Sequence, residues 1–246
     1  MARAREHLKN APIVEAVLDF RVLRNVEVSP ETFAGLDSSI GKQYAQKSSM
    51  HSLQARFGVD RGRLVDPSQM EAVVGWVYRT TTELAQFRVD GFTFSKIEPY
   101  TTWEEVFEEA FRLWKVYVDA ARPREVSRVA VRYINRMRLA AVSDLGQYLE
   151  SPPLLPAPIP QMIREFLTRV YVDDDKSSAS AVIVQALEPR VDPSTISLLL
   201  DIDAFREMKN FAPDDLGLPA IFTELRRLKN DIFFASITEK TAEIYA

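Results

Sequence analysis

The chain has 246 residues and a hydrophobic content of 46%, which is enough to bury a substantial core in one large domain or two small ones. It contains no cysteine, which excludes disulfide frameworks, thiolate nucleophiles and sulfur-ligated metal centres. Its formal net charge of -4 excludes a global field that would draw the protein to nucleic acid, so such a site would have to be a local patch.

The first predicted elements are a strand and a helix. Residues 13–22 alternate between polar and apolar side chains, which predicts a half-buried strand. Ser29 and Pro30 are typical of the start of a helix, and apolar residues follow them at spacings of three and four. A helix is therefore predicted over residues 30–46.

Residues 52–97 are expected to form an antiparallel meander. Alternation returns in this region, and Asp90-Gly91 between two β-rich runs is the strongest short hairpin signal in the chain. The expected strands cover residues 53–60, 73–80, 84–89 and 92–97.

A long helix is predicted next, over residues 102–121. Thr102 and Glu105 have the spacing of a capping box, and a wide apolar stripe with several aromatic side chains follows. At helical spacing such a stripe indicates core packing rather than a platform for stacking bases. A strand over residues 126–139 and a short helix over residues 145–149 complete this half.

Five prolines between residues 152 and 160 form an extended connector that regular structure cannot cross. The connector, residues 151–160, separates a strand-rich half, residues 1–150, from a second half, residues 161–246, and we expect both halves to form one compact unit. The elements predicted for the second half are a short helix over 161–167, strands over 168–173, 180–187 and 195–203, a helix over 204–210 that Asp201 and Asp203 could cap, and a long helix over 219–235.

The expected fold class is α+β. An antiparallel sheet built from two similar halves is predicted, with the helices 102–121 and 219–235 packed on one face. The opposite face is predicted to be polar and available for a ligand, a partner or a second copy of the chain.

Four segments carry a resemblance to a known family. They are residues 10–22 (NAPIVEAVLDFRV), residues 90–103 with DGFTFS, EPY and Trp103, residues 132–136 (RYINR) and residues 234–239 (FASITE). In these segments the chain resembles a family of sporadically distributed bacterial proteins of about this length. The resemblance covers essentially the whole chain, which favours a single unit. It implies a bacterial accessory protein, of the kind associated with phage defence or toxin–antitoxin operons, and it implies no particular reaction or cofactor.

The strand predicted over residues 126–139 carries the clearest candidate site. Alternate residues of a strand face one side, so its arginines are predicted to share a face with arginines of neighbouring strands. Arginine binds planar oxyanions through paired hydrogen bonds, which favours an anionic ligand. The predicted ligand-binding residues are Arg128, Arg132, Asn135, Arg136, Arg138, Arg56 and Arg88.

An alternative for these arginines stays open. The same polar positions of the strands contain Glu15, Asp19, Asp60 and Asp90. Arginines and acids could therefore pair across strands on a solvated face, where each pair contributes little.

A second candidate is a magnesium site. Asp201 and Asp203 fall on one face of a strand, and Glu98 could supply a third oxygen ligand for phosphoryl transfer. The alternative is that these acids cap a helix or contact solvent. No other metal or cofactor is expected.

Three functions from different classes follow from these patterns. The leading hypothesis is a non-catalytic module that binds an anionic small molecule or a partner protein, with nucleic acid less favoured. The second is a magnesium-dependent nuclease or phosphotransferase that uses Asp201 and Asp203. The third is a structural subunit that assembles, for example as a homo-oligomer, through exposed apolar residues. No membrane segment is found in the sequence, and a cytoplasmic location is expected.

Overall fold

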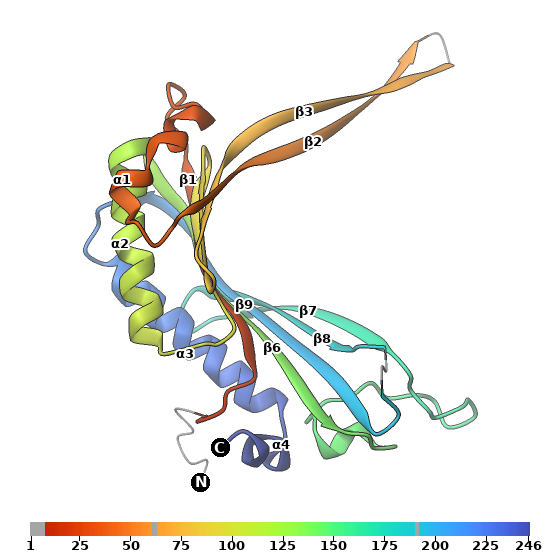
Figure 1. Cartoon of the computed structure of the whole chain (residues 1–246). Helices are drawn as coiled ribbons and strands as arrows, with labels where there is room; N and C mark the ends of the chain where they lie inside the picture. Colours follow the sequence, from red (N-terminus) through yellow and green to blue (C-terminus); the bar gives the residue numbers. More distant parts are fainter. Residues whose placement is uncertain (1–7, 61–62, 190–191) are drawn as a thin grey trace.

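The computed structural model describes residues 8–60, 63–189 and 192–246, with the side chains of residues 53–71 left out. The described strands form a nine-stranded antiparallel sheet in the order β2-β3-β4-β5-β1-β6-β9-β8-β7 (Figure 1). The strands are β1 (Ile13–Leu23), β2 (Gln46–Asp60), β3 (Arg63–Arg79), β4 (Glu83–Arg88), β5 (Gly91–Ile97), β6 (Glu125–Ala140), β7 (Phe166–Asp174), β8 (Ala179–Leu187) and β9 (Thr195–Phe211). The helices are α1 (Asp37–Ile40), α2 (Trp103–Ala121), α3 (Leu218–Ser236) and α4 (Glu239–Ile244), with short 3₁₀-helices at Pro30–Gly35 and Leu145–Gln147.

The first strand lies inside the sheet. β1 pairs with β5 on one side and with β6 on the other, so that Leu18 lies opposite both Phe94 and Val131. These side chains are fully buried and point toward the helices, as the alternation of the sequence requires. The strands on both sides of the proline-rich segment therefore belong to one sheet, with β6 from the first half paired to β9 from the second.

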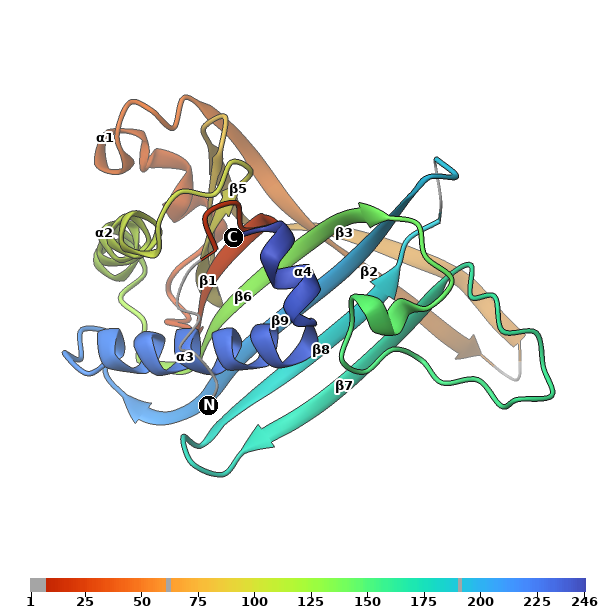
Figure 2. The same cartoon turned by 90° about the horizontal axis from the view of Figure 1, so that it is seen from below.

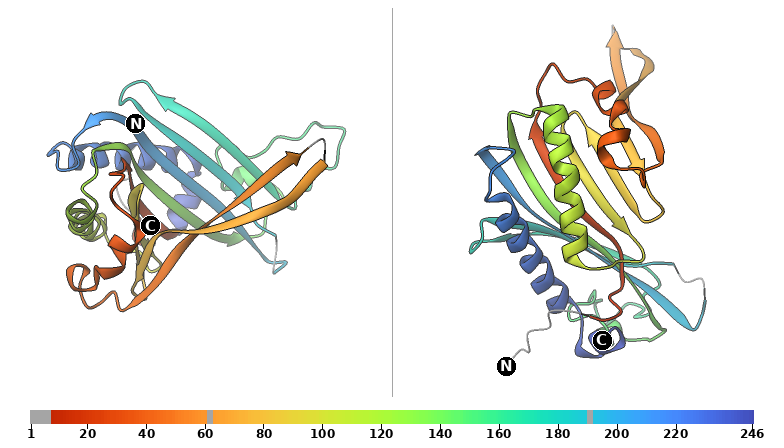
Figure 3. Two further views of the ribbon diagram at one scale, coloured as in Figure 1. Left: turned by 90° about the horizontal axis from the view of Figure 1, so that it is seen from above. Right: turned by 60° about the vertical axis from the view of Figure 1, so that its left-hand side comes forward.

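The two long helices pack on the same face of the sheet, as predicted (Figure 3). The hydroxyl oxygen of Thr102 accepts a hydrogen bond of 3.2 Å from the backbone N–H of Glu105, which confirms the predicted cap of α2. The ring of Phe20 on β1 stacks on that of Trp114 on α2 at 4.3 Å, and it also contacts Phe222 on α3. Burying a side chain of this size stabilises the fold by roughly 2–3 kcal/mol.

The sheet is strongly bent, so its two ends reach away from the helices. The β2–β3 hairpin extends from one end and strands β6 to β9 extend from the other, and α2 and α3 lie on the outside of the bend (Figures 1 and 2). The opposite, concave face carries no helix among the described residues. Within the same residues, no helix is long and apolar enough to cross a membrane.

The meander and its Asp90-Gly91 turn are confirmed by the β4–β5 pairing, whereas three predicted helices are wrong. Residues 30–46 form only a 3₁₀ turn and the short α1, because Gly41 takes a φ of 103° that ends the helix before β2 begins. Residues 161–167 form no helix, and β7 starts at Phe166 because it pairs with β8. Residues 204–210 continue β9, because they pair with β6 as far as Phe211.

Candidate functional site

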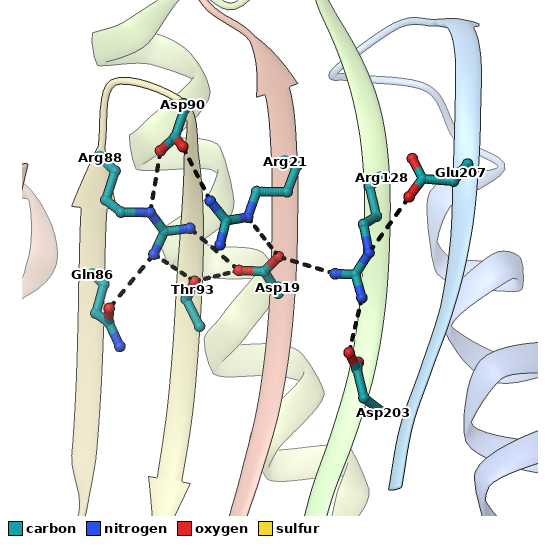
Figure 4. Close-up of polar contacts among 9 residues, drawn as sticks. All are labelled: Asp19, Arg21, Gln86, Arg88, Asp90, Thr93, Arg128, Asp203 and Glu207. Atoms are coloured by element: carbon teal, nitrogen blue, oxygen red, sulfur yellow. Dashed lines mark hydrogen bonds and ion pairs between the residues drawn. The ribbon is translucent and has the colours of Figure 1, made fainter. Parts of the chain in front are cut away.

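Strand β6 carries the predicted arginines on the concave side of the sheet. Its register with β9 places Arg128 opposite Glu207 and Arg132 opposite Asp203. Figure 4 draws the polar side chains around Arg128 on one side of the strands, with a helix behind them. Asn135 lies on the other face, where it is buried and donates a hydrogen bond of 2.9 Å to the carbonyl of Leu200.

Asp19 on β1 is the centre of a network of ion pairs (Figure 4). Its carboxylate oxygens lie 3.1 Å from Nε of Arg21, 3.3 Å from an Nη atom of Arg88 and 3.5 Å from one of Arg128. The hydroxyl of Thr93 donates a further hydrogen bond to the same carboxylate at 2.5 Å. Four strands, β1, β4, β5 and β6, are thus joined through one acid, and the three guanidinium groups share its charge.

Arg132 and Arg136 of this face also form ion pairs with acids. Arg132 donates two hydrogen bonds, of 2.8 and 2.6 Å, to Asp201, and this pairing raises the pKa of Arg132 above its usual value. Arg128 also lies 2.9 Å from Asp203, and Arg136 lies 3.1 Å from Glu188. The face therefore presents matched charges rather than a row of free cations, which is the alternative that the sequence left open.

The remaining predicted ligand-binding arginines differ in their surroundings. Arg88 is only 8% exposed and is held by Asp90, Thr93 and Asp19. Arg138 is exposed and forms no ion pair within 4 Å among the described residues, although its charge helps to lower the pKa of Glu188. The side chain of Arg56 lies outside the part of the chain whose side chains are described.

The acids proposed as magnesium ligands are not brought together. Asp201 and Asp203 lie on β9, where each is engaged by an arginine of β6. Burial raises the pKa of Asp203 despite the neighbouring Arg128. Glu98 follows β5, and strands β1 and β6 separate β5 from β9. In the described parts of the chain, no three acidic or histidine side chains form a group that could hold a metal ion.

A small pocket that is open to solvent lies on the helix side of the sheet. It is formed between α3, the start of β1 and the middle of β6. Its polar lining consists of Tyr100, Tyr133, Asn135, Arg226, Lys229 and Asn230, and its apolar lining of Leu8, Ala11, Ile13, Phe233 and Phe234.

Lys229 is the unusual residue of this pocket. Its side chain points from α3 toward the sheet, only 7% exposed, and its Nζ atom lies 3.6 Å from the centre of the Tyr133 ring. Among the described residues no acid pairs with it and no hydrogen bond involves its ammonium group. Burial, with a smaller contribution from Arg226, lowers the pKa of Lys229 to about 7.

Arg226 lies one turn earlier on α3 and is compensated. Its guanidinium group lies 3.6 Å from Glu104 of α2 and 5.2 Å from the centre of the Trp103 ring. The uncompensated charge of the pocket is therefore that of Lys229.

Two tyrosine hydroxyls complete the polar wall of the pocket. The oxygens of Tyr100 and Tyr133 lie 3.1 Å apart, so one hydroxyl donates to the other. Burial raises the pKa of both groups, which keeps them protonated. Two protons and one mutual hydrogen bond leave one O–H donor free for an acceptor in the pocket.

Sequence reasoning named Asn135, but together with the arginines of the opposite face, and it missed the other residues of the pocket. A signal existed, because Lys229 lies four residues after Leu225 and four before Phe233, which places it on the buried stripe of α3. A lysine at such a position is either paired or functional, since an isolated buried ammonium is costly. The tyrosine pair joins residues of two distant segments, so no local pattern could predict it.

The comparisons with known proteins add no assignment. No protein-family model matches the chain, and no curated protein matches it either.

Proposed function

We propose that this protein is a non-catalytic binding module for a small organic anion, which the pocket on the helix side holds against Lys229. The observation that carries the proposal is a buried ammonium group with no acidic partner among the described residues. The proposal keeps the anionic ligand expected from the sequence and moves it from the arginines of the concave face to the opposite side of the sheet.

The energetics of burial support an anionic ligand. An ammonium group that is removed from water loses its hydration, and only part of this loss is recovered by the ring of Tyr133. A carboxylate or another oxyanion bound beside Nζ would recover much of the remainder, through a charge-assisted hydrogen bond in a site largely shielded from solvent. The free tyrosine O–H donor is available to the same ligand.

The lining of the pocket favours a ligand with an apolar or aromatic body. Phenylalanine and aliphatic side chains form one wall, and the cationic and hydroxyl groups form the other. This combination is typical of sites for small molecules, in which apolar contacts supply area and a few polar groups fix the orientation. Benzoate, an aromatic monocarboxylate, is therefore a suitable probe.

The charges of the concave face give less support to an anionic ligand there. Five arginines, at positions 21, 88, 128, 132 and 136, are paired with six acids, at positions 19, 90, 188, 201, 203 and 207. An anion binding to these arginines would have to compete with carboxylates already in place.

The test is calorimetric titration of the full chain with sodium benzoate at pH 6.5, with benzamide as the uncharged analogue. We expect benzoate to bind and Lys229→Met to weaken it by at least about tenfold, the value of one charge-assisted hydrogen bond. Benzamide should bind at least about tenfold more weakly than benzoate for the same reason.

Lys240→Met is the matched control. Lys240 also lies over a tyrosine ring, 5.0 Å from the centre of Tyr148, but it is exposed and outside the pocket. Its replacement should leave the benzoate affinity unchanged. An equal affinity of the wild type and the Lys229→Met variant, or equal binding of benzoate and benzamide, would refute the proposed role of the lysine.

A further inference from the structure

Strand β7 is an edge of the sheet and only one of its sides is paired. β8 pairs with it along all nine residues, without any irregularity in register, and no described strand pairs with its outer side. The sequence FLTRVYVDD contains neither lysine nor proline, which are common protections of edge strands. Leu167, Val170 and Tyr171 are 72%, 50% and 53% exposed.

The other edge of the sheet is different. β2 carries Lys47, and its pairing with β3 shifts register at Met50/His51 and again at Arg56/Gly58. Irregularities and charges of this kind hinder pairing with another chain. β7 also carries charges, but its pairing with β8 is regular and it contains no proline, so its outer side is open to a further strand.

We infer that β7 pairs with β7 of a second copy of this chain, antiparallel and around a two-fold axis that passes beside Tyr171. Such an axis stands perpendicular to the sheet, so residues that face one another belong to the same face in both copies. With Tyr171 on the axis, Arg169 lies opposite Asp173 of the second copy, and Val170 lies opposite Val172 of the second copy.

Charge and hydrophobicity select this register. Arg169 is exposed and has no acidic partner among the described residues, whereas Asp173 accepts only a hydrogen bond from Ser180, at 2.6 Å. The two-fold axis forms the Arg169–Asp173 pair twice, and opposite charges facing each other across strands are stabilising.

Neighbouring registers are worse. An axis at Val170 would place Arg169 opposite Tyr171 and Asp173 opposite Leu167. An axis at Val172 would place Asp173 opposite Tyr171, Val170 opposite Asp174 and Arg169 opposite Asp175, which lies beyond the end of β7. Each alternative loses the ion pairs between Arg169 and Asp173 and sets an acid against an apolar or aromatic residue.

The absence of cysteine from the chain permits a direct test of the register. In Tyr171→Cys the two thiols of a dimer face one another, with Cα atoms about 4.5–5.5 Å apart, within the reach of a disulfide. In the control Thr168→Cys, which keeps the Arg169–Asp173 pair, they are offset by six residues along the strand, or roughly 20 Å, which is too far. Mild oxidation with copper–phenanthroline should therefore cross-link the first variant at least about tenfold faster than the second.

Charge variants test the same pairing without cross-linking. Arg169→Asp sets like charges opposite each other twice, so the dimer measured by light scattering should dissociate at about tenfold higher concentration or more. The double variant Arg169→Asp/Asp173→Arg restores the opposite charges and should restore the dimer.

Three results would overturn the inference: a monomer at every concentration tested, equal cross-linking at positions 171 and 168, or a dimer whose dissociation is unchanged by Arg169→Asp. The pocket of Lys229 is not part of this surface, so these outcomes are independent of benzoate binding.

Discussion

The Nζ atom of Lys229 lies 3.6 Å from the centre of the Tyr133 ring, while the hydroxyl of the same tyrosine lies 3.1 Å from that of Tyr100. A buried cation, the face of an aromatic ring and a hydroxyl pair are thus combined at one wall of the pocket. The ring stabilises the ammonium through its negative face, but this interaction is weaker than an ion pair in a site with little water. The buried ammonium group therefore lacks an ion-pair partner, and an anion bound beside it would stabilise its charge further.

The first prediction concerns the pH dependence of stability. The pKa of Lys229 is about 7 in the folded protein, below the ordinary value of 10.5, so the unfolded chain binds more protons between these two pH values. The free energy of unfolding should therefore rise with pH from about 7 to 10.5, and the cost of burying the charge is fully present below pH 7. Lys229→Met should remove this rise and stabilise the protein at pH 6 by an amount on the order of 3–5 kcal/mol.

Urea denaturation at pH 6, 8 and 9 measures this effect. The difference between the variant and the wild type should shrink as the pH increases. Lys240→Met should keep the wild-type slope. A Lys229→Met variant with the wild-type slope would show that the lysine keeps an ordinary pKa.

The second prediction concerns the pH dependence of ligand binding. An anion prefers the protonated lysine and raises its pKa, so binding above pH 7 requires the uptake of a proton. The dissociation constant for benzoate should be constant between about pH 5.5 and 7, where the carboxylate is ionised, and should rise by about tenfold per pH unit above 7, until the pKa of the complex is reached. Calorimetry in two buffers of different ionisation enthalpy should detect the proton uptake at pH 8. A dissociation constant that stays flat from pH 6 to 9 would contradict the prediction.

The third prediction concerns the ion-pair network of the concave face. Asp19→Asn removes the charge shared by Arg21, Arg88 and Arg128, and Arg88 is only 8% exposed. Breaking a buried pair from one side should lower the free energy of unfolding by roughly 3 kcal/mol. Glu207→Gln is the control, because this acid is 71% exposed and lies 3.8 Å from Arg128, so its replacement should cost less than about 0.5 kcal/mol. Chemical denaturation measures both values, and equal effects would show that Asp19 is not the centre of the network.

The elements that the sequence predicts best are those with strong local signals. The Asp90-Gly91 turn, the cap at Thr102 and the apolar stripe of α3 identified a hairpin and both long helices. Residues 204–210 were misassigned because their conformation depends on pairing with β6, which lies far away in the sequence. Strand pairing of this kind overrides local preference.

In the candidate sites, too, the local features were predictable and the features that depend on distant segments were not. The alternation of β6 predicted which face carries Arg128 and Arg132, but the acids that neutralise them come from β1 and β9. Their positions follow from strand order and register, which a single sequence does not reveal. The sequence shows that Lys229 is a charged residue on the apolar stripe of α3. Whether an acid pairs with it depends on how α3 packs against β6, and among the described residues none does.

The position of β1 inside the sheet also has a consequence for how the chain folds during synthesis. β1 leaves the ribosome before the other described strands, yet its neighbours β5 and β6 are made only after the β2–β4 meander and after α2, respectively. Contacts such as Leu18 with Val131 are distant in sequence, and proteins dominated by such contacts fold slowly. The apolar residues of β1 thus stay unpaired for much of translation, so the nascent chain is expected to depend on chaperones until β6 has emerged.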